Sequence, residues 1–229
     1  MLGPRSGDEL SSLVLDLPGS GATPAPPEPW GSEQYAELVA AAMDELAGRS
    51  DGGAGESVST IELPATILGH SFGGRVALAL ASSRPDLVGA LVLAGVPLLP
   101  RPGRPSRPSL KYRTVRALGR AGIVGDERLE KARQRYGSAD YRRAQGVMRS
   151  VLVRTLAEDY ADELALLRSR ETPVELVWGA GDAEVPMQVA EALGEALPGA
   201  RLTIVQGAGH LTPLEAPAEI RKAVERALA

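Results

Sequence analysis

The chain has 229 residues, and its 44% hydrophobic content suits one large domain, or a core with a modest insertion. It carries 25 Lys and Arg against 29 Asp and Glu, and it contains no cysteine, which excludes disulfides, thiolate metal sites and a cysteine nucleophile. The longest apolar stretch, Leu87 to Pro100, is broken by glycine and proline and is too short to span a bilayer. The start, MLGPRSGDEL, lacks the basic and apolar parts of a secretory signal, so we expect a cytoplasmic protein without a membrane partner.

The first expected element is a buried strand from Leu13 to Leu17, because this short apolar run closes in the turn-forming residues 18–21. A helix is expected from about Glu33 to Gly48, where apolar residues recur at helical spacing and Ser32 can cap the start. Residues 49–59 are rich in Gly and Ser and are expected to form a mobile loop.

Strands and helices alternate in much of the remaining chain. The expected strands are Ala65–Leu68, Leu87–Ala94, Val174–Trp178 and Leu202–Val205, and the expected helices are Phe72–Ser83, Met187–Leu197 and Ala218–Leu228. This order predicts an α/β fold: a mostly parallel sheet with helices on both faces, and a ligand site at the carboxyl ends of the strands.

Residues 97–171 interrupt the alternation with a helix-forming, Arg-rich segment that has no strand signal. We interpret them as a helical cap inserted between two parts of the core, 1–96 and 172–229. Residues 100–150 hold 14 Arg or Lys against 4 acids, which could attract an anionic substrate or a nucleic acid. The scarcity of aromatic residues leaves no platform for stacking bases, so we interpret the run from Arg101 to Arg149 as solvated cap surface and expect no nucleic-acid partner.

The sequence Gly69-His70-Ser71-Phe72-Gly73 leads from an expected strand directly into an expected helix. This is the context of a nucleophile elbow, a turn so tight that glycines must flank the serine. Such a turn lifts the Ser71 hydroxyl above the sheet. The helix that begins at Phe72 directs its free N–H groups at the place where an oxyanion would form, so the Phe72 N–H is a candidate oxyanion donor.

A nucleophilic serine needs a general base, and the chain has only two histidines. His70 precedes the serine, so its side chain should point away from the hydroxyl and serve in packing or hydrogen bonding. His210 follows the last expected strand through a Gly-rich loop at the same edge of the sheet. We therefore predict His210 as the base.

The protonated base needs a carboxylate to orient it. Asp182 lies in the loop after the expected strand Val174–Trp178, and Glu184, two residues on, is the alternative. The chain order Ser71, Asp182, His210 agrees with a Ser-His-Asp site built on α/β strands. Asp16 is interpreted instead as a structural residue that binds turn amides beside its strand.

The sequence has no HExxH, Walker or GxGxxG motif, and two histidines are poorly suited to a metal cluster. We therefore expect neither a cofactor nor a metal.

These residues together resemble the alpha/beta hydrolase superfamily, especially its small capped bacterial members. LDLPGSG, GHSFGG, WGAGDAEVP and GAGHLTPLEAP are similar to four successive loops of that family, and the stretch Tyr136 to Tyr141 looks like part of its cap. The resemblance implies a serine hydrolase that acts through an acyl-enzyme on a small ester, thioester, lactone or amide, with Ser71, His210 and Asp182 as its triad. Relatives with the same triad also catalyse perhydrolysis, carbon-carbon hydrolysis and lyase reactions.

The start of the chain departs from the family pattern. Family members place further strands and a His-Gly loop, the source of a second oxyanion donor, before the LDLPG element, and no His-Gly dipeptide occurs in this chain. We expect that Met1 is an internal or misplaced start. The competing interpretation is a catalytically impaired, hydrolase-like binding protein.

Overall fold

The computed structural model describes residues 12–48, 61–100 and 144–229. The expected loop at 49–59 and the cap residues 101–143 lie outside this part. In chain order the elements are α1 (Ser32–Gly48), β1 (Ala65–His70), α2 (Phe72–Ser83), β2 (Val88–Ala94), α6 (Gly146–Thr155), α7 (Ala161–Ser169), β3 (Val174–Gly179), α8 (Met187–Ala196), β4 (Arg201–Val205), α9 (Thr212–Glu215) and α10 (Pro217–Ala227).

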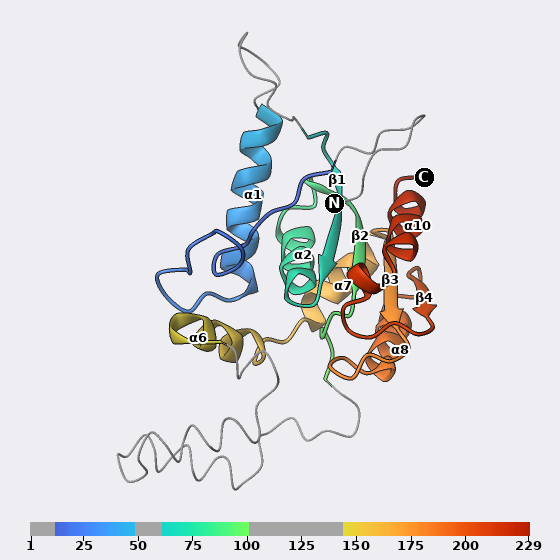
Figure 1. Ribbon diagram of the computed structural model, residues 1–229. Coiled ribbons are helices and arrows are strands. Elements are labelled where there is room, and N and C mark those ends of the chain that lie inside the picture. The colour runs from blue at the N-terminus through green and yellow to red at the C-terminus, as the bar shows by residue number, and fades with distance from the viewer. Residues whose placement is uncertain (1–11, 49–60, 101–143) are drawn as a thin grey trace, which may run out of the picture.

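The four strands form one parallel sheet in the order β1-β2-β3-β4 (Figure 1). β2 and β3 are buried almost throughout, whereas β1 and β4 are partly exposed, as expected of central and edge strands. Because all four strands are parallel, their carboxyl ends lie at the same edge of the sheet. The strands and helices predicted between residues 65 and 229 are confirmed, with their ends shifted by at most two residues.

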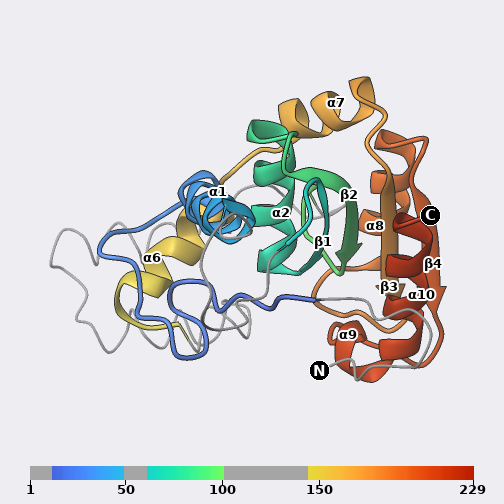
Figure 2. The same cartoon turned by 90° about the horizontal axis from the view of Figure 1, so that it is seen from above.

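Helices cover both faces of the sheet, as predicted (Figure 2). Successive residues of β2 point to opposite faces because a strand has a period of two. Leu91 and Leu93 pack in the larger core cluster, with α2 and α8. Val92 packs on the other face against Ile220 and Ala223 of α10. The core thus has two layers of apolar contact, one on each side of β2 and β3.

The helix α1 packs against α2 rather than directly on the sheet. Its Tyr35 is fully buried and makes edge-on ring contacts with Trp30 at 5.4 Å and with Phe72 at 5.0 Å between centroids. Ser32 was expected to cap this helix. Its hydroxyl instead donates to the carboxylate of Glu158 at 2.6 Å, because the segment after α6 reaches the start of α1.

The strand expected at Leu13 to Leu17 is wrong. These residues form no strand, and Leu13, Val14 and Leu15 are 46%, 85% and 39% exposed. An apolar run becomes a strand only when a neighbouring strand binds its backbone groups, and among the described strands none pairs with this segment. The sheet expected to include it therefore ends at β1 in the described part of the chain.

The described part of the predicted cap is helical. It consists of α6, which lies near α1, and α7, which packs against α2 (Figure 2). Two arginines fasten this segment to α2: the Arg75 guanidinium donates to the Thr155 carbonyl, and Arg170 donates to the carbonyls of Ala81 and Ser82. The division into core and cap stays a prediction, since most of the cap lies outside the described residues.

Candidate active site

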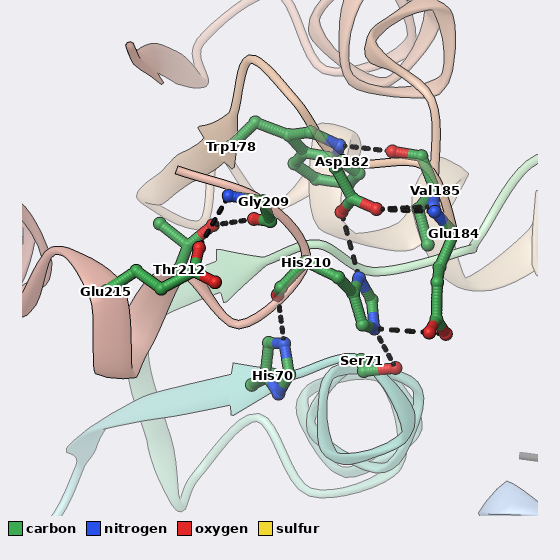
Figure 3. Close-up of polar contacts among 10 residues, drawn as sticks. All are labelled: His70, Ser71, Trp178, Asp182, Glu184, Val185, Gly209, His210, Thr212 and Glu215. Atoms are coloured by element: carbon green, nitrogen blue, oxygen red, sulfur yellow. Dashed lines mark hydrogen bonds and ion pairs between the residues drawn. The ribbon is translucent and has the colours of Figure 1, made fainter. Parts of the chain in front are cut away.

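The loops that follow β1, β3 and β4 meet at the carboxyl edge of the sheet and bring three predicted residues together (Figure 3). Ser71 lies directly after β1, Asp182 lies three residues after β3, and His210 lies five residues after β4. Parallel strands place their carboxyl ends on one side, and for this reason residues 139 positions apart can touch.

Ser71 occupies a strained turn between β1 and α2. Its φ of +50° and ψ of −114° lie outside the regions that residues with a side chain normally adopt. The Ser71 N–H is bound to the Ala94 carbonyl at 3.0 Å, which ties the turn to β2. The observed backbone agrees with the predicted elbow.

The close packing of this turn depends on Gly69 and Gly74. A Cβ on Gly69 would lie 2.5 Å from the Gly74 Cα, and a Cβ on Gly74 would overlap the side chain of Val96. Gly73, the second glycine of the predicted pattern, has open space where its Cβ would be. The steric requirement therefore falls on Gly74 rather than on Gly73.

His210 links the serine to the aspartate. Its Nε2 lies 3.1 Å from the Ser71 Oγ, and its Nδ1 lies 2.9 Å from the Asp182 Oδ2. An ionised carboxylate has no proton to give, so Nδ1 donates to Asp182, and in the neutral ring Nε2 is left as the acceptor for the serine hydroxyl. This tautomer is the one that a general base requires.

Asp182 is held firmly by its own loop. Its side chain is 0% exposed, and Oδ1 accepts the N–H groups of Glu184 at 2.9 Å and Val185 at 2.7 Å. The Val185 carbonyl in turn accepts the indole N–H of Trp178 at 2.8 Å. With Oδ1 occupied by the loop, Oδ2 is directed at His210.

Glu184, the alternative acid, lies on the other side of the ring. Its Oε2 is 3.9 Å from the His210 Nε2, and its side chain is 41% exposed. It is therefore not the partner of Nδ1. The structure brings Asp182 to that nitrogen.

His70 points away from the serine hydroxyl, as predicted, and hydrogen-bonds the loop of the other histidine. Its Nε2 lies 2.8 Å from the carbonyl oxygen of His210, and because a carbonyl only accepts, the proton is on Nε2. Burial lowers the pKa of His70 below its usual value, and the hydrogen bond to His210 only partly opposes this. A neutral imidazole is thus favoured beside the base.

Three further residues around His210, namely Gly95, Thr212 and Glu215, are features that the sequence does not predict. Gly95 has a φ of +56°, and a Cβ there would lie 3.2 Å from both Asp182 Oδ2 and His210 Nδ1. Glu215 accepts the Gly209 N–H at 2.5 Å, and the Thr212 hydroxyl donates to the Gly209 carbonyl at 2.8 Å. The short helix α9 therefore anchors the loop. Its signal in the sequence is the Thr-Pro pair soon after His210.

Phe72 is the first residue of α2, so its N–H has no acceptor within the helix. Its position next to Ser71 agrees with the predicted oxyanion donor. Asp16 accepts the Ala22 N–H at 3.2 Å, so it binds a turn amide as predicted, although the run that contains it forms no strand. Within residues 12–48, 61–100 and 144–229, no group of three or more His, Asp or Glu is arranged to hold a metal. In the same part of the chain no helix is long and apolar enough to cross a membrane.

A model of the alpha/beta hydrolase family matches residues 2–223. Among curated proteins, a pimeloyl-[acyl-carrier protein] methyl ester esterase of Neisseria meningitidis is 29% identical over 222 residues, a match that covers 86% of this chain. The chain spans 61% of the length of that relative. The enzyme of the same name from Aromatoleum aromaticum is 31% identical over 193 residues. That match covers 72% of this chain and 74% of the length of the relative.

Solved structures show the same fold. A hydrolase from Pseudomonas aeruginosa superposes with a TM-score of 0.60 at 22% identity and covers 93% of this chain and 77% of its own. A thermophilic esterase from Thermogutta terrifontis gives a TM-score of 0.58 at 22% identity with the same coverage.

Proposed function

Since the chain belongs to the alpha/beta hydrolase family, we propose that it is a serine hydrolase of small carboxylic esters. One observation carries this proposal: the hydrogen-bonded series from the Ser71 hydroxyl through His210 to Asp182, with distances of 3.1 and 2.9 Å. A nucleophile, a base in the correct tautomer and an orienting acid are the three parts that acyl transfer requires.

In this mechanism the Ser71 Oγ attacks the ester carbonyl carbon while its proton passes to the His210 Nε2. The carbonyl oxygen becomes an oxyanion, which the Phe72 N–H stabilises. When the carbonyl re-forms, the bond to the alcohol oxygen breaks, and the alcohol takes the proton from Nε2. A water molecule then attacks the acyl-enzyme in the same way, with His210 taking its proton. The carboxylic acid leaves, and the Ser71 hydroxyl is restored.

Asp182 acts through His210. During attack the imidazole becomes a cation, and the buried carboxylate at 2.9 Å from Nδ1 stabilises that charge and keeps the ring oriented. Its own orientation is set by the two N–H groups at Oδ1. The strained Ser71 backbone similarly fixes the nucleophile before substrate arrives.

The ester class is supported by the two esterases that match most of this chain at 29% and 31% identity. The names of these two enzymes describe a methyl ester of a carrier-bound acyl chain. For this chain we propose the broader class, a small neutral acyl ester. Thioesters, lactones and amides could be cleaved by the same steps.

Hydrolysis of 4-nitrophenyl pentanoate tests the proposal. We expect turnover by the wild type and a fall of at least about 10³-fold in kcat for Ser71→Ala, because the covalent route is lost. The alanine variant should keep its thermal unfolding midpoint within a few degrees, which separates catalysis from folding. Equal rates for the two proteins would overturn the assignment of Ser71 as the nucleophile.

A further inference from the structure

Glu184 is a second carboxylate at the site, and the proposed mechanism does not use it. Its Oε2 lies 3.9 Å from the His210 Nε2, the nitrogen that exchanges a proton with the serine and the leaving group. In Figure 3 its side chain reaches down beside the imidazole toward the same end of the ring as Ser71. Its charge is therefore next to the reacting atoms.

The position of Glu184 is set by the triad itself. Its backbone N–H donates to the Asp182 Oδ1 at 2.9 Å, and this hydrogen bond holds the Glu184 backbone next to the buried acid. Its side chain remains 41% exposed. Within the described part of the chain, no lysine or arginine forms an ion pair with it.

The resting enzyme gains little from this carboxylate. The neutral His210 ring offers a lone pair at Nε2, and a carboxylate can only accept, so the two atoms form no hydrogen bond. The negative charge acts instead on whatever approaches Ser71. Two charges a few ångströms apart near a protein surface interact appreciably even after screening.

We propose that Glu184 is a specificity-determining residue that selects against negative charge on the substrate near the scissile carbonyl. It disfavours acyl or leaving groups that carry a carboxylate or phosphate there, and it admits neutral ones. The same charge repels the carboxylate product that every cleaved ester leaves beside Ser71, so it also weakens product binding. This inference rests on the proposed esterase function.

A matched pair of substrates tests it. 4-Nitrophenyl pentanoate and mono-4-nitrophenyl glutarate share the leaving group and the five-carbon acyl chain, and they differ in the terminal carboxylate. The quantity to compare is the ratio of kcat/KM for the neutral ester to that for the anionic ester. We expect Glu184→Gln to lower this ratio by about 3- to 10-fold, mainly by improving the anionic substrate.

Two variants serve as controls. Glu191→Gln removes the same charge from an exposed position on α8 and should leave the ratio within about twofold of the wild type. Glu184→Asp keeps the charge on a shorter side chain and should retain most of the discrimination. The wild-type ratio should also fall as ionic strength rises from about 0.01 to 0.5 M, because salt screens an exposed charge.

Product inhibition gives a second readout. Pentanoate should inhibit the Glu184→Gln variant at about 3- to 10-fold lower concentration than the wild type. An unchanged substrate ratio together with an unchanged inhibition constant would overturn the inference. If the wild type does not hydrolyse the neutral ester, the proposed function fails, and the Kd of pentanoate from an NMR titration still decides on Glu184: equal values in the two proteins would contradict the inference.

Discussion

The His70 Nε2 donates a hydrogen bond to the His210 backbone carbonyl at 2.8 Å. The residue that precedes the candidate nucleophile thus holds the loop that carries the candidate base. The centroids of the two imidazole rings are 5.0 Å apart. The hydrogen bond from His70 to the His210 carbonyl joins the end of β1 to the loop after β4. His70 is therefore expected to position the base without touching the substrate.

Replacing His70 by phenylalanine should lower kcat by about 10- to 100-fold with KM changed less than about threefold, because a small shift of His210 misaligns proton transfer. His70→Gln keeps a side-chain N–H and should recover a substantial part of kcat. Steady-state kinetics on 4-nitrophenyl pentanoate measures both values. Equal losses in the two variants would refute a role for the donated hydrogen bond.

The lowered pKa of His70 links stability to pH. The unfolded chain takes up a proton near pH 6.5, whereas burial in the folded chain delays protonation to lower pH. The unfolded state therefore binds more protons in that window, and stability is lost as pH falls from about 6.5 through the lowered pKa. In His70→Gln the loss of urea-unfolding free energy between pH 7.5 and 5.5 should be smaller than in the wild type. Parallel pH curves for both proteins would rule this out.

The two carboxylates of the loop after β3 should differ sharply in effect. Asp182→Asn is expected to lower kcat by about 10³- to 10⁴-fold, because the amide can favour the wrong His210 tautomer and cannot stabilise the imidazolium. Glu184→Gln should change kcat on the neutral ester less than about tenfold. If Asp182→Asn retained most of its activity, Asp182 would not be the orienting acid.

Two neighbouring glycines in the elbow give a matched pair for stability. Gly74→Ala should destabilise the fold by about 1–3 kcal/mol, because the new methyl group overlaps Val96. Gly73→Ala, with open space at its Cβ, should be neutral or stabilise by up to about 1 kcal/mol. Urea unfolding compares them. Val96→Ala in the Gly74→Ala background should restore part of the loss, and the absence of any difference between the single variants would contradict the packing argument.

Sequence periodicity was sufficient for the elements that carry the site. β2 reads as a continuous apolar run because both its faces are buried, and Ser71 is recognisable because a strand, a glycine-flanked serine and a helix follow one another. His210 could be predicted because the chain has only two histidines and the other adjoins the serine. These signals come from residues that are close in the sequence, so they can be recognised without knowledge of the tertiary contacts.

The features that the sequence did not reveal depend on contacts between distant segments. The run from Leu13 to Leu17 has strand-like composition, but pairing decides a strand, and no described strand pairs with it. The sequence favours Asp182 over its loop neighbour Glu184, but only the fold of that loop shows that Asp182 reaches the His210 Nδ1 while Glu184 lies near Nε2. Likewise, the space limit at Gly74 comes from Val96, a residue on the exit of another strand.

Covalent labelling with a fluorophosphonate probe, mapped by peptide mass spectrometry, tests most directly whether Ser71 is an activated nucleophile. The wild type should take up one equivalent on the peptide that contains Ser71, His210→Ala should react far more slowly, and Ser71→Ala should not react. A folded wild-type protein that stays unlabelled, or equal labelling of Ser71→Ala, would contradict the central claim.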